Sequence, residues 1–497
     1  IDGVSLLFVL LSTFLTPICI LASWDAIEHR VREYMIAFLV LETMMIGVFV
    51  ALDLVLFYLF FEAGLIPMFL IIGVWGGEDR IYASVKFFLY TMIGSLLMLI
   101  AILYVYFKAG GDGVYSFLLT DMLAVDLTFT EQIWLFAAFF LAFAIKVPLF
   151  PFHTWLPLAH VQAPTAGSVI LAGVMLKMGT YGLIRFAFPL FPDALKTFAP
   201  YIAILCVIGI IYGAIVAMVQ DDFKKIVAYS SVSHLGFCVL GLVAMTPMGL
   251  SGGIYIMLAH GIATGGLFLC VGILYERRHT KKVKDFGGIS KSMPIFATAF
   301  MIITFASVGL PGLNGFVGEF LALIGTSQSQ FLWFDAPQIW QPIPEVGYRL
   351  VDAPFFPMPD TQQAGPEFTA FIFASLAASG VIFAAGYLLW MFRRVMFGPI
   401  THPVNATLQD LKPREMLYLA PILAMCIFMG VYPKFFLGRI EPAVDQFLTY
   451  MDSQVTASGT VVVEDVAPGW VPQGKMLDEP VLDAAPLGSP TPRTTGE

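Results

Sequence analysis

Hydrophobic residues along the chain form long runs that short polar segments separate. Most runs are close to the roughly 20 apolar residues that a helix needs to cross a bilayer. The run 35–76 is too long for one crossing, and Asp53 divides it. We therefore predict twelve transmembrane spans, at 3–23, 35–52, 54–76, 84–107, 132–156, 166–188, 199–219, 225–245, 250–274, 294–325, 368–392 and 415–435.

Two of these spans contain residues that break helices. Pro148 and Pro151 interrupt span 132–156, because proline lacks a backbone donor and clashes with the preceding turn. Span 294–325 breaks near Pro311 and Gly312. The two spans cross in opposite directions, as in inverted-repeat transporters. The predicted fold class is therefore all-α, a polytopic membrane helix bundle with two inverted repeats, each containing a broken helix.

The domain organisation follows from this order of spans. We expect an N-terminal span and loop at 1–34, a first inverted repeat at 35–188, a second at 189–397, a C-terminal span with an amphipathic segment at 398–452, and a tail at 453–497. The second repeat includes a long loop, 326–366, that is rich in proline and aromatic residues. The tail has six prolines and is predicted to be disordered or to contact a partner.

Positive charge is distributed unevenly between the two sides of this arrangement. Of the 26 lysines and arginines, 16 fall in the alternate loops that begin with 24–34, eight in the other set, and two within spans. Because cytoplasmic loops carry the excess of lysine and arginine, both termini are predicted to lie on the periplasmic side. The localisation expected is a bacterial cytoplasmic (inner) membrane.

Composition excludes several classes of protein. The chain is 59% hydrophobic and 12% charged, whereas a soluble domain is about 25% charged. The five cysteines occur singly, so neither a disulfide framework nor an iron–sulfur ligand set is indicated. No nucleotide-binding motif and no metal site is indicated either. We expect no cleavable signal peptide, and we expect residues upstream of Ile1 to be missing.

Ionisable residues inside the spans are the candidate functional site. A charge at the bilayer centre costs at least ~2.5–3.5 kcal/mol on insertion scales, so such residues are paired, neutral or hydrated. The candidates for a proton relay are Glu62, Lys146, Lys177, His234, His260 and Glu319. Each also has a structural reading, as a packing, capping or snorkelling residue. A scaffold in which the charges lock helices together, and haem ligation by the two histidines, are further alternatives.

Individual roles follow from position. Glu62 is the expected partner of Lys146, stabilising its ammonium when close and releasing it when apart. His234 and His260 lie among serines and small residues that leave room for water, and imidazole passes protons through either nitrogen. The role of Glu42 is left open. His153 and His160 are expected at an entrance, whereas Asp53 and the cluster Asp221, Asp222, Lys224 and Lys225 are expected to be solvated boundary residues.

Five motifs resemble one membrane-protein family. They are FFEAGLIPM (60–68), AFAIKVPLFPFHTWLPLAHVQAPTAGSVILAGVMLK (142–177), IVAYSSVSHLGF (226–237), MLAHGIATGGLF (257–268) and LPGLNGFVGEF (310–320). This set is similar to the proton-translocating membrane subunits of respiratory complex I, the NADH:quinone oxidoreductase, and their relatives in multisubunit cation/proton antiporters. Within the family it resembles the subunit M (chain 4) branch, in which a glutamate stands at the position of Glu319 where sister subunits L and N usually have lysine.

The resemblance implies a fold and a function. It implies fourteen helices, of which the first two are absent here, and proton transport through the six candidate residues from cytoplasm to periplasm. It also implies redox chemistry elsewhere: no cofactor in this chain, and FMN, iron–sulfur clusters and quinone in other subunits. The implied partners are other membrane subunits, especially the neighbouring antiporter-like ones, and lipid, but not nucleic acid. A subunit of a multisubunit cation/proton antiporter or of a membrane-bound hydrogenase is the alternative.

Overall fold

The computed structural model describes residues 2–111, 113, 115–333, 338–343, 347–352, 366–400 and 402–457. The helices of the first half are α1 (Gly3–Ala22), α2 (Val31–Val50), α3 (Leu54–Ala63), α4 (Leu65–Trp75), α5 (Arg80–Gly111), α6 (Leu119–Leu123), α7 (Phe129–Lys146), α8 (Trp155–Gln162), α9 (Thr165–Ile170), η1 (Leu171–Met175), α10 (Leu176–Gly182), η2 (Leu183–Ala187), α11 (Phe188–Leu190) and α12 (Pro192–Met218). Those of the second half are α13 (Phe223–Val243), α14 (Pro247–Arg278), η3 (Val283–Asp285), η4 (Ile289–Lys291), α15 (Pro294–Val308), α16 (Asn314–Ser327), α17 (Pro366–Met396), η5 (Pro403–Thr407), α18 (Pro413–Val431) and α19 (Lys434–Ala457).

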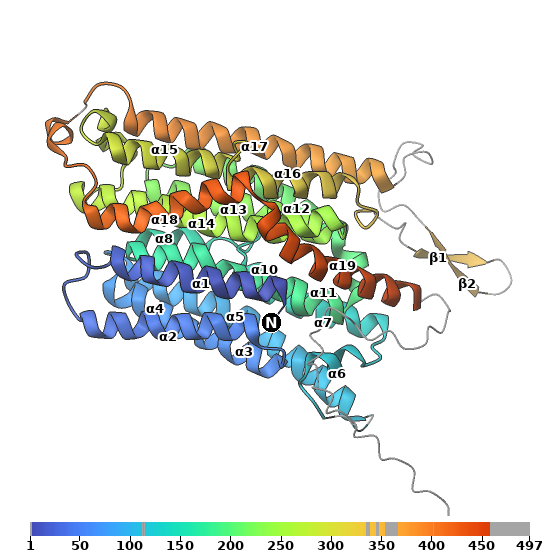
Figure 1. Ribbon diagram of the computed structural model, residues 1–497. Helices are drawn as coiled ribbons and strands as arrows, with labels where there is room; N and C mark the ends of the chain where they lie inside the picture. The colour runs from blue at the N-terminus through green and yellow to red at the C-terminus, as the bar shows by residue number, and fades with distance from the viewer. Residues whose placement is uncertain are drawn as a thin grey trace, which may run out of the picture.

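The long helices lie side by side in one bundle, as Figure 1 shows. Within the described residues, eleven helices are long and apolar enough to cross a membrane, and they match eleven of the predicted spans. The remaining predicted span, 294–325, is divided between α15 and α16, and α15 alone has only 15 residues. The predicted all-α membrane bundle is therefore confirmed. Outside the two breaks, the span boundaries shift by up to seven residues, and the largest shift is at the start of α12, where Pro192 stands at the first helical position. Asp222 and Thr246 cap α13 and α14, which begin two and three residues before the predicted spans.

The two ends of the bundle are defined by which loops meet there. At one end, Phe223 N–H donates to the Lys281 carbonyl (2.9 Å), and Lys281 Nζ donates to the Val161 carbonyl (2.8 Å). At the other, Leu54 N–H donates to the Phe117 carbonyl (2.9 Å). We call the first the basic end, because it gathers the lysine- and arginine-rich loops, and the second the far end. This grouping matches the predicted alternation of loops.

Both predicted helix breaks are present. The first separates α7 from α8, so this span runs from the far end to the basic end. The second lies between Val308 and Asn314, so α15 and α16 together run from the basic end to the far end. Gly309 and Gly312 in this break have φ of +81° and +90°, which favour glycine. The two broken helices are therefore antiparallel, as inverted repeats require.

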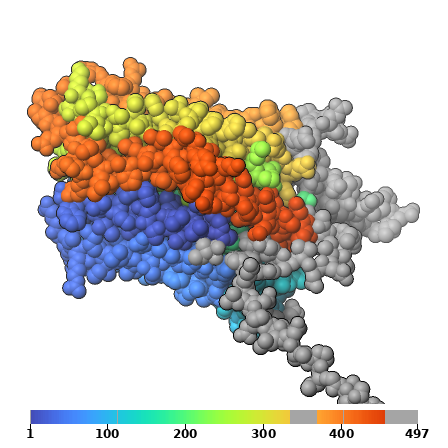
Figure 2. Space-filling view, viewed as in Figure 1, coloured from blue at the N-terminus to red at the C-terminus, as the bar shows by residue number. Residues whose placement is uncertain are grey.

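Two segments differ from the predicted loop and tail. Part of the predicted loop 326–366 forms a small antiparallel hairpin of β1 (Gln338–Ile343) and β2 (Gly347–Asp352). The predicted tail 453–497 begins inside α19, because the amphipathic helix continues to Ala457. The remainder of the tail lies outside the described residues. In Figure 2 the red and orange surface of α18 and α19 lies directly against the blue surface of α1.

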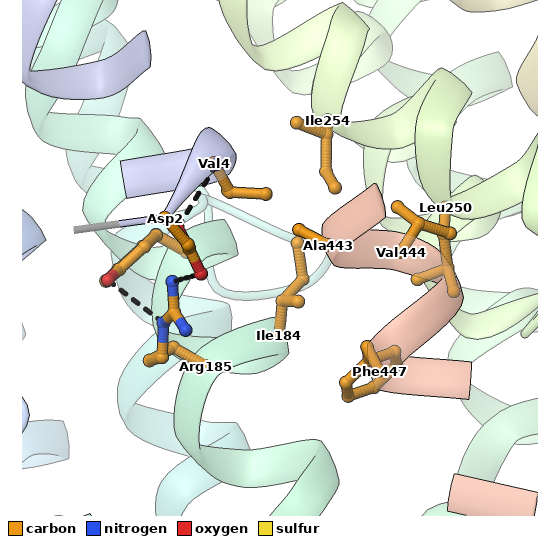
Figure 3. A pocket seen from close by; sticks show the side chains of 10 residues that line it. Asp2, Val4, Ile184, Arg185, Leu250, Ile254, Ala443, Val444 and Phe447 are labelled. Atoms are coloured by element: carbon orange, nitrogen blue, oxygen red, sulfur yellow. Dashed lines mark hydrogen bonds and ion pairs between the residues drawn. The ribbon is translucent and has the colours of Figure 1, made fainter. Parts of the chain in front are cut away.

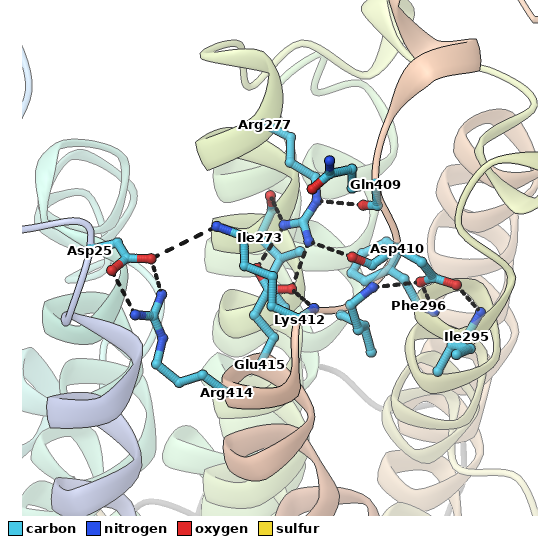
Figure 4. Close-up of polar contacts among 11 residues, drawn as sticks. Asp25, Ile273, Arg277, Ile295, Phe296, Gln409, Asp410, Lys412, Arg414 and Glu415 are labelled. Carbon is cyan, nitrogen blue, oxygen red and sulfur yellow. Dashed lines mark hydrogen bonds and ion pairs between the residues drawn. The ribbon is translucent and has the colours of Figure 1, made fainter.

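A network of charges at the basic end joins α14, α15 and α18 (Figure 4). Arg277 at the end of α14 donates to both oxygens of Glu415 (2.8 and 2.6 Å) and to the carbonyls of Gln409 and Asp410. The Asp410 carboxylate accepts from the backbone N–H of Ile295 (2.8 Å) and Phe296, in the first turn of α15. The start of the broken helix is thus tied to α14 and α18.

A second part of this network reaches α1. Arg414 donates to both carboxylate oxygens of Asp25, just after α1, and these hydrogen bonds hold the Asp25 pKa below its ordinary value. A carboxyl with a lowered pKa adds stability above its unfolded-state pKa of about 4 and loses that contribution as the pH falls through the lowered value. Because Asp25 is exposed, water screens this link.

The first prediction concerns the buried pair Arg277–Glu415. The Arg277→Met variant leaves the Glu415 carboxylate, whose side chain is 1% exposed, without its cation. Breaking a buried pair in this way costs about 3–5 kcal/mol. We expect the purified complex to release this subunit at lower temperature, measured by thermal denaturation with native electrophoresis. In the control variant Lys412→Met, which loses an exposed contact of 3.8 Å with Asp25, stability should change by less than about 1 kcal/mol. Equal stability of the two variants would contradict the conclusion that the buried Arg277–Glu415 pair stabilises the subunit in the complex.

Candidate functional site

The centre of the bundle consists of three spans with nearly completely buried surfaces: Thr165–Leu190, α13 and α14. Lys177 lies on the first of these and His260 on α14, and both side chains are buried. Lys177 Nζ is 2.7 Å from His260 Nδ1 and also donates to the Ala172 carbonyl. Snorkelling to the membrane surface, the structural reading of Lys177, is therefore wrong, because the ammonium is directed into the protein.

His234 and Glu319 form the second pair of the centre. His234 Nδ1 is 2.8 Å from Glu319 Oε1, and both side chains are more than 90% buried. His234 Nε2 lies 3.4 Å from the Tyr387 hydroxyl of α17. The rings of His234 and His260 have their centroids 6.1 Å apart. Four of the six predicted residues therefore lie in one run: Lys177, His260, His234 and Glu319.

A small cavity joins the two pairs. Its lining includes His234, His260, Ser307 and Glu319, and it is large enough for water. Among the described residues, none makes a hydrogen bond to His260 Nε2 or to Ser307 Oγ, although both atoms are buried. Buried polar atoms are normally paired, so these two are the expected partners of water. The cavity is too small for a porphyrin, and the haem alternative finds no support here.

The break between α15 and α16 is shaped around Glu319. A Cβ on Gly309 would lie 2.9 Å from Glu319 Oε2 and would displace the carboxylate, and the positive φ of Gly309 favours glycine as well. Asn314, at the start of α16, donates from Nδ2 to the Ala259 carbonyl (3.1 Å), beside His260. Ala306, Ser307 and Gly315, on the two sides of the break, line the cavity, so the irregular backbone lies next to it.

Glu62 and Lys146 form a separate group. Lys146 is buried, and its Nζ lies 4.6 Å from the centroid of the Phe61 ring. In the part of the chain that the structure describes, Lys146 Nζ and Glu62 Oε1 have no hydrogen-bond partner. In this conformation the expected Glu62–Lys146 pair therefore has its separated arrangement, without a direct contact, and its close arrangement stays a prediction. Glu62 instead lies beside Ser95 of α5 and interacts with Lys146 only through the electric field.

Close packing of helices links Lys146 to the centre. A Cβ on Gly179 would lie 3.1 Å from the Lys146 Cβ and 2.8 Å from a methyl carbon of Val147. A Cβ on Gly182 would lie 2.3 Å from the Phe143 ring. Two glycines on α10 therefore allow α7 to approach the helix that carries Lys177. The structure provides no direct hydrogen bond from Lys146 to Lys177, so a proton crossing this gap needs water.

Toward the basic end, His160 continues the line from Lys177. Its ring is completely buried and stacks on Phe268 at 4.6 Å. Of the described side chains, none is hydrogen bonded to either His160 ring nitrogen. Lys224, expected to be a solvated boundary residue, is instead buried and donates to the Ala163 carbonyl (2.6 Å). That expectation was wrong because the loop after α8 folds over the start of α13. Lys224 and Lys177 both act electrostatically on His160.

Three other ionisable residues that the sequence singled out lie outside this line. His153 packs against the Tyr212 ring at 5.2 Å. Asp53 caps α3 by accepting from Leu56 N–H (2.8 Å), as expected of a boundary residue. Glu42 is half-buried beside Thr16 of α1, and its role stays open.

Sequence reasoning missed three polar residues of the centre. Tyr387 contacts His234, Ser307 lines the cavity and Asn314 reaches α14. The sequence gives only a weak indication that these residues belong to the site, because each is a single uncharged polar residue within an apolar helix or beside a break.

A second cavity lies nearer the far end, away from the histidines (Figure 3). Arg185 and Asp2 form an ion pair on its wall, and Arg185 also donates to the Tyr181 hydroxyl (3.0 Å) and to Ser5 Oγ (2.9 Å). Burial alone raises the pKa of Asp2, but Arg185 and the Ser5 N–H outweigh it and hold this pKa below its ordinary value. Most of the remaining lining is aliphatic. The ion pair therefore joins α1 to the Lys177 helix.

The match to known proteins begins with a family model. Residues 51–336, more than half of the chain, match the family described as "NADH:quinone oxidoreductase/Mrp antiporter, TM". This defines the class of protein as a membrane-spanning subunit of that type.

Curated relatives define the branch. The chain is 48% identical over 452 residues to "NADH-quinone oxidoreductase subunit M" of Rhodobacter capsulatus, covering 89% of this chain and 80% of that protein. It is 44% identical over 453 residues to "NADH-ubiquinone oxidoreductase chain 4" of Marchantia polymorpha, covering 90% and 82%. The chain therefore belongs to the antiporter-like membrane subunits of NADH:quinone oxidoreductase, in the subunit M (chain 4) branch.

Solved structures agree with this assignment. A chain of respiratory complex I from Thermus thermophilus is 34% identical, with a TM-score of 0.77, covering 91% of this chain and 85% of that one. A chain of the Mrp complex from Dietzia sp. is 18% identical, with a TM-score of 0.74 over 91% and 85%. The second likeness shows a shared fold only.

The second prediction tests whether the cavity holds a functional water. The Ser307→Val variant replaces an unpaired hydroxyl with methyl groups and fills the space beside His260 and Glu319. We expect proton pumping per NADH oxidised to fall roughly tenfold or more, since a positioned proton carrier contributes about 10²–10⁴-fold. Pumping is measured with a pH-sensitive dye in proteoliposomes of the intact complex.

The matched control is Thr304→Val, one turn earlier on α15. Its buried hydroxyl donates to the Phe300 carbonyl of its own helix (2.7 Å), so its loss should leave pumping nearly unchanged. If both variants pump equally well, the cavity takes no part in transport.

Proposed function

We propose that this chain carries protons across the membrane arm of NADH:quinone oxidoreductase along Glu62, Lys146, Lys177, His260, His234 and Glu319. The observation that carries the proposal is the run from Lys177 to Glu319, in which hydrogen-bond distances of 2.7 and 2.8 Å flank one cavity. A charge without a partner at this depth has a high free-energy cost. A proton-transfer path gives each of these groups a neighbour with which it can exchange a proton.

The histidines supply the transfer step. When Lys177 donates a proton to His260 Nδ1, the imidazole can release its other proton from Nε2 toward the cavity. Water beside Nε2 passes it to the Glu319 carboxylate, directly or by way of His234. Each step moves a proton between groups about one hydrogen bond apart, which is the reach that acid–base transfer requires.

We propose that protons enter the path at the basic end. We take this end as the cytoplasmic side of a bacterial inner membrane, which places both termini on the periplasmic side. His160 interacts electrostatically with both Lys224 and Lys177, and its two unbonded ring nitrogens suit a relay between them. The excess of lysine and arginine in the loops of this end supports the orientation. We propose that protons leave the path toward the far end by way of Glu319.

We propose that redox chemistry in other subunits, where FMN, iron–sulfur clusters and quinone would be bound, drives proton transfer along this path. The energy would arrive as a change in the distance between Glu62 and Lys146. Moving one charge against 100 mV requires ~2.3 kcal/mol, and a swing of two pKa units in a lysine supplies about 2.7 kcal/mol. The inverted repeats 35–188 and 189–397 would then serve as two coupled halves of one path.

The third prediction distinguishes proton transfer from a scaffold role. Both Lys146→Met and Lys146→Arg should abolish proton pumping by the assembled complex, because methionine holds no proton and arginine does not release one. A scaffold that needs only a positive charge would tolerate arginine. Pumping is measured in proteoliposomes, with assembly checked by native electrophoresis.

Three outcomes would contradict this interpretation of Lys146. Lys146→Arg could retain full pumping, both variants could fail to assemble, or an assembled Lys146→Met complex could pump normally. Sodium-dependent proton flux in a complex without FMN or iron–sulfur clusters would instead support the antiporter alternative.

The fourth prediction concerns entry. The His160→Phe variant keeps an aromatic ring to stack on Phe268 but removes both ring nitrogens. We expect proton pumping to fall roughly tenfold while the complex still assembles, measured as dye response per NADH oxidised. The control Phe268→Leu disturbs the same stack without touching a proton carrier and should retain most of the activity. Equal losses in the two variants would indicate that His160 only packs.

A further inference from the structure

An open cleft at the basic end is separate from the proton path. It lies between the loop that follows α14 and the last turns of α17, and it encloses about 1250 Å³ of space that is open to solvent. Lys284 and Phe286 line one wall, and Trp390, Arg393, Arg394 and Phe397 line the other.

Hydrogen bonds hold the two walls together. Gly288 N–H donates to the Phe397 carbonyl (3.3 Å), and Ser290 Oγ donates to the Met396 carbonyl (2.7 Å). Phe286 is buried and packs on Phe223 at 5.3 Å, which fixes the inner side of the loop wall. The cleft is therefore a built feature of two segments that are about 100 residues apart in sequence.

The charge of the cleft has one sign. Lys284, Arg393 and Arg394 are exposed, and its lining within the described residues contains no aspartate or glutamate. The nearest acid in sequence, Asp285, accepts a hydrogen bond from Thr280 Oγ1 (2.6 Å). The Arg394 guanidinium lies 4.6 Å from the centroid of the Trp390 ring, which orients it beside the aromatic wall. Such a site favours an anion that carries oxygen acceptors.

The surface of α17 leads from the cleft into the depth of the membrane. Ile382, Gly386, Leu389 and Arg393 follow a spacing of four, three and four residues, and so share one face of the helix. Ile382 is 74% exposed and Leu389 is 40% exposed. An apolar strip therefore runs directly below two exposed arginines and an indole, which is the arrangement of residues found at a membrane interface.

We propose that this cleft binds an anionic phospholipid, with its phosphate between Lys284, Arg393 and Arg394 and an acyl chain along the exposed face of α17. Basic pockets between transmembrane helices on the cytoplasmic side suit such headgroups. The apolar strip distinguishes a lipid from a free phosphate, which needs the cations but gains nothing from Ile382 or Leu389.

The experiment uses the intact complex in nanodiscs of phosphatidylcholine. A minor fraction of the lipid is photoreactive phosphatidylglycerol or, in a parallel sample, photoreactive phosphatidylcholine, and the labelled segment 382–397 is quantified by mass spectrometry. We expect phosphatidylglycerol to label this segment more strongly. Arg393→Gln/Arg394→Gln should reduce that labelling about ten- to thirtyfold, because each cation near an anionic lipid contributes about a fivefold factor. Lys284→Gln, on the opposite wall, should reduce it about fivefold.

The matched control is Arg32→Gln/Lys225→Gln, which removes two exposed charges at the same end of the bundle but outside the cleft. Its labelling should equal that of the unaltered complex. Equal labelling by the two lipids, insensitivity to the cleft substitutions, or cross-links from 382–397 to a neighbouring subunit in place of lipid would overturn the proposal. Loss of labelling on addition of inorganic phosphate would show that a soluble anion occupies the cleft, and would also overturn it.

Discussion

The high cost of a charge without a partner is the constraint on which this structure depends. A lysine or glutamate at bilayer depth is tolerated only where another group or water offsets its desolvation. Lys177, His260, His234 and Glu319 meet this condition by lying in one run around a cavity. Lys146 meets it less completely, with the face of Phe61 as a neighbour. The fold therefore brings together polar groups from α10, α13, α14 and α16, and the outer helices separate them from lipid.

Helix irregularity and small residues make that arrangement possible. The break before α16 places Glu319 against Gly309, and the π-helical turns η1 and η2 flank α10, which carries Lys177. Gly179 and Gly182 let α7 approach closely enough for the Lys146 stem to touch α10. Charged contacts at the ends of the bundle, such as Arg277–Glu415 and Arg185–Asp2, hold the broken and unbroken helices in register. Polar function in the centre thus rests on packing and ion pairs at the periphery.

Much of the fold could be predicted from the sequence, because each span is a long apolar run and each break contains proline or glycine. The alternation of basic loops was equally visible, and the six ionisable residues stood out because charge is rare in such runs. The distances between the ionisable side chains could not be predicted from the sequence. Nothing in the spacing of Glu62 and Lys146 showed that their side chains lie apart in this conformation, since that depends on how α3 packs against α5 and α7. The burial of Lys224 was missed for the same reason, because a loop far away in sequence covers it. Single polar residues such as Ser307 gave too weak a signal.

The π-turn η1 has a consequence for where the Lys177 ammonium is held. In a regular α-helix each interior carbonyl is occupied by the amide four residues on, whereas the wider turn Leu171–Met175 leaves the Ala172 carbonyl accessible to the Lys177 ammonium one turn later. The same ammonium reaches His260. The ammonium is therefore anchored to its own helix and to the neighbouring helix at the same time, so a local widening of the backbone holds the Lys177 proton beside His260 without any movement of the side chain.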